Sequence, residues 1–349
     1  MTVVALSAAD TEEVSKAYSL ADLKGAVANA SIPMIDVVGE HVFAAGDEIT
    51  VPAGRTVTIF STGNGVLTGG GVGSSRFFSV EGTLTLENLS LLGGVAADGG
   101  AVLVEASGSL TVVSCTMSYN RAVTKSIPSP QMPKSEILQD YGYGGAIFSK
   151  GALVVEGSKF AGNNGIGGAI AVGDPTLPEA SASATVTATA FEANKSPSSQ
   201  AGAIANFAST DVTRCMFSAN YASTVGGALY SSNPKGGDAA KLVVTGSSFS
   251  ANKVDAHETK IINSQDVYIN SGSSVGDTDW CVCGPCRLIS VHALRLAACH
   301  RLWSHLAAPS TPPHPTPPHP TPPHPTPTAP HARPRGKPAA CQLRACARS

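Results

Sequence analysis

The stretch FAGNNGIGGAI, residues 160–170, decides the fold of this chain. It joins a tail, Phe-x-x-Asn, to a head, Gly-Gly-Ala-Ile, and both parts recur. Five tails pair a large apolar anchor with an asparagine three positions later: Met117 with Asn120, Phe160 with Asn163, Phe191 with Asn194, Phe217 with Asn220, and Phe249 with Asn252. Heads of this type occupy residues 99–102, 144–147, 167–170, 201–204 and 226–229. Such recurrence indicates a repeat architecture.

Each tail follows a segment in which apolar and polar residues alternate. In the quoted repeat the apolar positions are Leu153 and Val155, and Ser158 is the small residue two places before the anchor. Alternation with a period of two predicts strands that bury one face. The strands are short, and the spacing between asparagines varies. We therefore expect constant strands joined by loops of variable length.

The pattern extends beyond the five complete tails in both directions. Upstream it continues through residues 84–91 and ends at Gly94, where an asparagine would stand. Downstream we expect one further unit, with Val267 as the anchor and Asn270 as the asparagine. The sequence thus predicts about seven coils of one repeating unit.

A parallel β-helix fits these features. Each short strand would pair with its equivalent in the next coil, at a rise of ~4.8 Å, so that like residues stack in columns. The phenylalanines would form a core column, and the side-chain amides of five asparagines would form a ladder: Asn120, Asn163, Asn194, Asn220 and Asn252. We also expect the asparagines to turn the corner in the left-handed region, as Gly94 could. A β-sandwich is the alternative, but it does not require the same residue at equivalent corners.

Composition divides the chain into three predicted parts. Residues 1–35 form an N-terminal segment with a capping helix, residues 36–279 form the β-helix, and residues 280–349 form a basic tail rich in Cys, Pro and His. The sequence suggests an N-cap at Asp10, and Leu20, Leu23 and Val27 share one helical face. We expect the segment ITVPAGRTVTIFS, residues 49–61, to form the first coil.

Charge separates the tail from the rest of the chain. Residues 1–279 carry 25 acidic side chains and 15 Lys or Arg, a net charge of -10, which argues against a nucleic-acid partner. Residues 280–349 carry no acid and 8 Lys or Arg. The repeat TPPHP within the tail predicts an extended, disordered segment, and the abrupt change of composition also suggests a gene-model artefact. The spacing of CVCGPC at residues 281–286 is not a standard zinc pattern, so we expect no metal there, and a redox or disulfide role stays open. We expect no cofactor.

The repeated GGAI and FxxN motifs resemble those of the chlamydial polymorphic outer membrane proteins, which also occur in β-helix proteins of the pectin-lyase-like superfamily. The resemblance covers residues 36–275. It implies a right-handed parallel β-helix exposed on a cell surface, often acting in adhesion. We find no recognisable signal peptide and no apolar run of the roughly 20 residues that a membrane span needs, but expect an extracellular or cell-surface location from the resemblance.

Enzymes of this fold use clustered acids, and glycosidases need paired carboxylates. In this chain the acids are scattered over connectors, namely Asp98, Asp140, Asp174, Asp211 and Asp238. The sequence therefore favours a non-catalytic protein that acts in adhesion or binds a carbohydrate or a cell-surface protein. A polysaccharide lyase or glycoside hydrolase with a divergent site is the alternative.

The longest connector, residues 123–143, is the predicted binding loop, because loops on a rigid scaffold often carry ligand contacts. Its candidate residues are Lys134, Glu136, Asp140, Tyr141 and Tyr143, whose tyrosines could stack on sugar faces. A tolerated insertion without a function is the competing interpretation. Cys115 and Cys215 share one column three coils apart, ~14 Å at the strand spacing, so we expect free, buried thiols.

Overall fold

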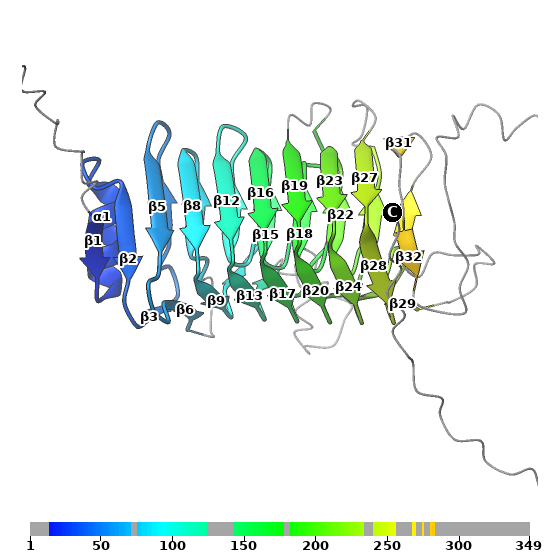
Figure 1. The fold of residues 1–349 in the computed structure, drawn as a ribbon, viewed down its shortest axis with the longest axis horizontal. Coiled ribbons are helices and arrows are strands. Elements are labelled where there is room, and N and C mark those ends of the chain that lie inside the picture. Colours follow the sequence, from blue (N-terminus) through cyan, green and yellow to red (C-terminus); the bar gives the residue numbers. More distant parts are fainter. Residues whose placement is uncertain are drawn as a thin grey trace, which may run out of the picture. The chain divides into compact units, whose positions relative to one another are not determined.

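The computed structural model describes residues 14–70, 75–123, 142–177, 182–233, 240–255, 267–269, 274–275 and 280–282. All of them belong to one compact unit, Met1–Arg295. They form a parallel β-helix, in which short strands stack coil upon coil into long parallel sheets (Figure 1). The Asp10 N-cap, the binding-loop residues before Tyr143, Asn270 and the tail after residue 282 lie outside the described residues.

Sheet A contains the alternating segments and has ten strands among the described residues. They are β1 (Val14–Ala17), β2 (Met34–Val37), β5 (Thr56–Phe60), β8 (Thr83–Glu87), β12 (Ser109–Val113), β16 (Ala152–Glu156), β19 (Ser183–Thr187), β23 (Ser209–Thr213), β27 (Lys241–Thr245) and β31 (Ser274–Val275). In a typical strand, β12, Leu110 and Val112 are buried and Ser109, Thr111 and Val113 face outward. The period-two alternation therefore gives the buried face that the sequence predicted.

Sheet B contains the anchors and has nine strands in the described part of the chain. They are β3 (Glu40–Phe43), β6 (Val66–Gly69), β9 (Ser90–Leu92), β13 (Thr116–Ser118), β17 (Lys159–Ala161), β20 (Ala190–Glu192), β24 (Met216–Ser218), β28 (Ser247–Ser250) and β32 (Trp280–Val282). Phe160, Phe191, Phe217 and Phe249 are register partners in successive strands. Their ring centroids lie 5.1, 4.9 and 4.9 Å apart with nearly parallel planes, so the predicted single file of rings is confirmed.

Sheet C contains the ends of the heads and has eight described strands. They are β4 (Ile49–Val51), β7 (Phe78–Val80), β11 (Val102–Val104), β15 (Ile147–Ser149), β18 (Ile170–Val172), β22 (Ile204–Asn206), β26 (Leu229–Ser231) and β30 (Val267–Ile269). Two-residue strands follow the tails and form two small sheets: β10 (Val95–Ala96) with β14 (Arg121–Ala122), and β21 (Lys195–Ser196) with β25 (Tyr221–Ala222) and β29 (Lys253–Val254). A coil thus runs from sheet C to sheet A to sheet B.

The helix α1 (Leu20–Ala28) lies at the N-terminal end of the solenoid (Figure 1). Its buried residues Leu23 and Val27 belong to the same core as the strands, as the sequence predicted. The buried Arg55 guanidinium donates hydrogen bonds to the carbonyls of Val27 at 3.1 Å and Ala30 at 3.3 Å, and also to Ile32. These bonds satisfy the carbonyl of Val27 in the last turn of the helix, which has no partner within it, and two carbonyls of the segment that follows the helix. Burial lowers the pKa of Arg55 from its usual value.

Three features of the N- and C-terminal coils differ from the sequence prediction. The helix is capped by Ser19, whose hydroxyl accepts from the Asp22 backbone N–H at 3.1 Å, and the segment after Asp10 forms strand β1 instead of helix. Strands β1 and β2 precede the expected first coil, and with nine described strands in sheet B the coils exceed the predicted number. Val267 pairs with Leu229 in sheet C and is not an anchor in sheet B. In the coil after Phe249, the strand of sheet B that pairs with this residue is β32.

Candidate functional site

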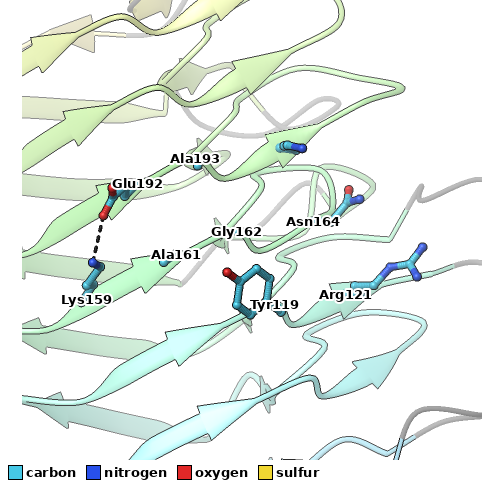
Figure 2. Close-up of a pocket in the computed structure, with 9 residues that line it drawn as sticks. Tyr119, Arg121, Lys159, Ala161, Gly162, Asn164, Glu192 and Ala193 are labelled. Carbon is cyan, nitrogen blue, oxygen red and sulfur yellow. Dashed lines mark ion pairs between the residues drawn. The ribbon is translucent and has the colours of Figure 1, made fainter.

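The strongest candidate site is a groove of about 490 Å³ on the outer surface where sheet B turns into the short strands. Figure 2 shows the described side chains that line it. They come from three segments on successive coils: Tyr119, Arg121, Lys159, Ala161, Gly162, Asn164, Glu192, Ala193 and Lys195. We refer to this set as the corner groove.

Small residues form the floor of the corner groove, and a tyrosine lies across one end. Ala161, Gly162 and Ala193 leave the floor low between longer side chains. The Tyr119 ring lies over Gly162, because a Cβ built on that glycine would come within 2.8 Å of the ring. Tyr119 is 71% exposed. The groove therefore offers one open aromatic face above a glycine that makes room for it.

The charge of the corner groove is positive within an acidic body. Arg121, Lys159 and Lys195 line it together with one carboxylate, Glu192. Lys159 Nζ lies 2.9 Å from a Glu192 carboxylate oxygen, and both side chains are about half exposed. An ion pair of this exposure contributes only about 0–1 kcal/mol to stability. The pair can therefore open to meet a ligand at small cost.

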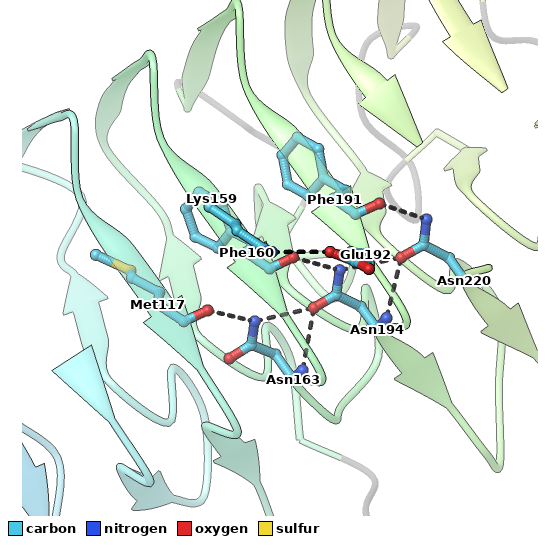
Figure 3. Close-up of polar contacts among 8 residues, drawn as sticks. All are labelled: Met117, Lys159, Phe160, Asn163, Phe191, Glu192, Asn194 and Asn220. Carbon is cyan, nitrogen blue, oxygen red and sulfur yellow. Dashed lines mark hydrogen bonds and ion pairs between the residues drawn. The ribbon is translucent and has the colours of Figure 1, made fainter. Parts of the chain in front are cut away.

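The asparagine ladder adjoins the corner groove in sequence, and Figure 3 shows it together with the groove residues Lys159 and Glu192. Asn163 Nδ2 donates to Asn194 Oδ1 at 2.9 Å, and Asn194 Nδ2 donates to Asn220 Oδ1 at 3.0 Å. Each amide also donates to a backbone carbonyl of the preceding coil, as Asn194 does to Phe160 at 3.0 Å. The same contacts recur at Asn120 and Asn252, so the predicted ladder is confirmed over all five residues.

The left-handed corner residue is the one before each asparagine, so the prediction that asparagine takes this conformation is wrong. The residues with positive φ are Tyr119, Gly162, Ala193, Ala219 and Ala251, with φ between 53° and 64°. The asparagine is required instead for hydrogen bonding, because its backbone N–H and its amide both donate to the next Oδ1. A non-glycine residue in the left-handed region costs about 1–2 kcal/mol. The corner groove is therefore built over strained positions that the ladder holds in place.

The two glycines of each head have different roles. Gly167 has a φ of +69°, and Ala201 takes the equivalent place with a φ of 62°. Gly168 is needed for space, since a Cβ there would lie 1.9 Å from the Gly202 carbonyl oxygen. This contact is with backbone, which cannot move away as a flexible side chain could. The recurring Gly-Gly pair therefore combines a turn with a close approach of neighbouring coils.

Of the predicted binding-loop residues, the structure describes only Tyr143, and it does not place it in the corner groove. The half-buried Tyr143 ring stacks on Phe148 with ring centroids 5.4 Å apart. It packs nearly perpendicular to the Phe207 ring, with ring centroids 5.9 Å apart. Burial, with the nearby Asp174 and Asp98 carboxylates, raises the pKa of Tyr143. Tyr143 thus packs over the outer side of sheet C. A binding role for the loop stays a prediction.

Cys115 and Cys215 are free and buried, as predicted. The Cys115 thiol donates to the Leu86 carbonyl at 3.4 Å, and its backbone N–H donates to Ser158 Oγ at 3.1 Å. Burial raises the pKa of both thiols to about 11. A thiol with this pKa is protonated at neutral pH, and the protonated form is a poor nucleophile.

Sequence reasoning missed the corner groove because its side chains stand at outward positions that vary between repeats. The only signal was charge and aromatic character next to an asparagine, as in Tyr119 and Arg121 on either side of Asn120. Within the described ranges, no group of three or more His, Cys, Asp or Glu residues is arranged to hold a metal ion. The helix that the structure describes is too short to cross a membrane.

Comparison with known proteins gives no assignment. No protein-family model matches the sequence, and no curated protein matches it.

Proposed function

We propose that this chain is a non-catalytic β-helix protein, secreted or exposed at a cell surface, that binds an acidic carbohydrate through the corner groove. The observation that carries the proposal is an exposed tyrosine ring, Tyr119, beside three cationic side chains and above a floor of small residues. The polymorphic outer membrane protein repeats that the sequence resembles agree with a surface role in adhesion.

The chemistry of the groove suits a sugar with a carboxylate or sulfate group. An aromatic ring offers a flat apolar face on which the C–H side of a sugar can stack. Arg121 and Lys195 line the groove from the two-residue strands β14 and β21, and cationic side chains make their strongest hydrogen bonds with such anions. Because the net charge of residues 1–279 is negative, this local positive cluster favours an anionic ligand at this place on the surface.

The repeat also predicts how a linear glycan would lie. Arg121, Asn164 and Lys195 are register neighbours in successive coils. The column continues through Tyr221 and Lys253. Equivalent positions rise by ~4.8 Å per coil, so this column offers polar, cationic and aromatic contacts at regular steps along the solenoid axis. A chain of sugars parallel to the axis would meet one such side chain at each coil.

A hydrolytic role is less well supported by the groove. Glycosidases act with two carboxyl groups on either side of the scissile bond. The described groove residues include one carboxylate, Glu192, which is paired with Lys159. The arrangement is therefore better suited to holding an anionic sugar than to cleaving it.

The full chain should be tested on an array of neutral, uronic-acid and sulfated glycans, followed by titration of the best ligand. Tyr119→Ala and Lys195→Glu should each weaken binding about tenfold or more, a loss of ~1.4 kcal/mol. The control Lys241→Glu reverses a charge at an exposed position of sheet A and should leave affinity unchanged.

Unchanged affinity in both groove variants would refute the site. Preference for a protein over every glycan would refute the carbohydrate assignment. Depolymerisation of pectin, alginate or a related uronate by the purified chain would show catalysis and overturn the non-catalytic proposal.

A further inference from the structure

The outer face of sheet A contains an array of hydroxyl groups that the corner groove does not use. In three neighbouring strands, β5, β8 and β12, the first and third residues face outward and all are threonine or serine. Register pairing aligns them into two columns, one of Thr56, Thr83 and Ser109 and one of Thr58, Thr85 and Thr111. The face is therefore a two-by-three array of equivalent hydroxyls.

The side-chain hydroxyls of these six residues have no hydrogen-bond partner among the residues that the structure describes. Threonines elsewhere do, since Thr68 donates to Glu40 at 2.8 Å and Thr62 donates to Asp36 at 2.9 Å. The hydroxyls of the array are thus left to bind solvent. Val154, the next residue in the second column, is 41% exposed, so the face is open there.

The spacing of the array is fixed by the backbone. Neighbouring strands are ~4.8 Å apart and alternate residues along a strand are ~6.7 Å apart, because both distances follow from β geometry. The strands lie side by side as a row of parallel arrows in Figure 1. Beneath the array the inward residues Leu84, Leu86, Leu110 and Val112 are fully buried, so the core supports the array from below.

The two columns of the array are uncharged over five strands. Next to β12, the outward residues at the same two positions are Ala152 and Val154 in β16, then Ser183 and Thr185 in β19. The next charged residues in these two columns are Asp211 in β23 and Lys241 in β27. At these two positions five successive coils therefore present small, neutral side chains, mostly hydroxyls that also carry a methyl group. The outward carboxylates of Glu87 in β8 and Glu156 in β16 border the array at the fifth position of their strands.

We propose that this hydroxyl face of strands β5, β8, β12, β16 and β19 binds ice. The regular columns of neutral hydroxyls can match a planar, neutral ligand that has its own two-dimensional repeat. Ice is such a ligand, because the strand spacing is close to the repeat of water molecules along a prism face of ice. Each hydroxyl both donates and accepts, so it can take the place of a water molecule in the lattice. The methyl groups between them order the adjoining water, as apolar surface does.

High β-propensity alone would also place threonine on an exposed strand, and it predicts no activity toward ice. The experiment distinguishes the two explanations. The full chain, labelled with a fluorophore, should enter a growing ice hemisphere, and it should slow recrystallisation in a frozen sucrose film. Thr85→Lys puts a long charged side chain at the centre of the array and should abolish both effects, with Thr111→Lys as a second variant on the next strand.

The matched control is Thr116→Lys, which makes the same change at an outward position of sheet B and should keep full activity. Melting temperature and circular dichroism confirm that each variant is folded. Exclusion of the full chain from ice, or equal activity in Thr85→Lys and Thr116→Lys, would overturn the proposal. Binding to crystalline cellulose that Thr85→Lys abolishes, without binding to ice, would assign the face to a polysaccharide surface instead. Lys195→Glu should leave ice binding intact. Loss of glycan binding at the corner groove can therefore be distinguished from loss of ice binding at the hydroxyl face.

Discussion

Replacing Asn194 by alanine should destabilise the chain strongly, because this side chain is the centre of the ladder. Its Nδ2 donates to Asn220 Oδ1 and to the Phe160 carbonyl, both at 3.0 Å. Its Oδ1 accepts from the backbone N–H of Asn163 at 3.0 Å and from that residue's Nδ2 at 2.9 Å. Two buried main-chain groups, the Asn163 N–H and the Phe160 carbonyl, lose these partners. At ~1–3 kcal/mol for each, the free energy of unfolding should fall by about 2–6 kcal/mol.

Thermal unfolding followed by circular dichroism measures this effect. For a domain of this size 1 kcal/mol corresponds to roughly 2–4 °C, so Asn194→Ala should lower the melting temperature by roughly 5–20 °C. The control Glu192→Gln, two residues earlier, breaks only the exposed ion pair with Lys159 and should cost less than about 1 kcal/mol. A shift in Asn194→Ala no larger than in Glu192→Gln would refute the view that the ladder holds the coils together.

Gly168→Ala should prevent folding because the added Cβ would lie 1.9 Å from a backbone oxygen. Ala201→Gly should change the free energy of unfolding by about 1 kcal/mol and the melting temperature by only a few degrees. Soluble yield and melting temperature of both variants test this, and a well-folded Gly168→Ala would contradict it. The buried Nδ1 of His41 has no partner among the described residues, so His41→Leu should raise the melting temperature by about 2–4 °C, and a decrease would show that the imidazole is needed. Burial raises the pKa of the Cys115 and Cys215 thiols from 9.0 to about 11 in the folded chain. Between these pH values the folded chain holds its thiol protons more tightly than the unfolded chain, so the free energy of unfolding falls as the pH rises. A variant with alanine at both positions should lose less stability between pH 9.0 and about 11 than the parent chain, and equal losses would exclude the thiols as the cause.

The sequence predicted the parts of the fold that repeat a chemical requirement in every coil. The aromatic file needs a large ring at one position, and the ladder needs an amide at another, so Phe191 and Asn194 can be identified without a structure. The left-handed corner could not be placed in this way. Tyrosine, glycine and alanine all stand there, because the ladder imposes the backbone conformation and the side chain at that place is left to vary.

The sequence did not predict the strand register at the C-terminal end or the corner groove, for related reasons. Val267 fits the anchor by spacing, but the long connector before it carries no motif to fix which sheet it joins, and pairing with Leu229 decides the matter. The groove combines outward side chains from neighbouring coils, such as Tyr119 and Lys195. Their proximity follows from the stacking and from the length of each loop, and the side chains at both positions change from one repeat to the next.

In the β-helix, equivalent residues follow one another by one strand spacing per coil. Distances between nitroxide labels test it most directly, with labels attached at outward positions of sheet A in a chain whose native cysteines are replaced. One label stays at Thr58 and the second moves to Thr185, Asp211 or Val243, which lie in the same column. We expect separations of ~19, ~24 and ~29 Å, a linear increase of ~4.8 Å per coil with a few ångströms of spread from the labels. Separations that do not grow with the number of coils would contradict it.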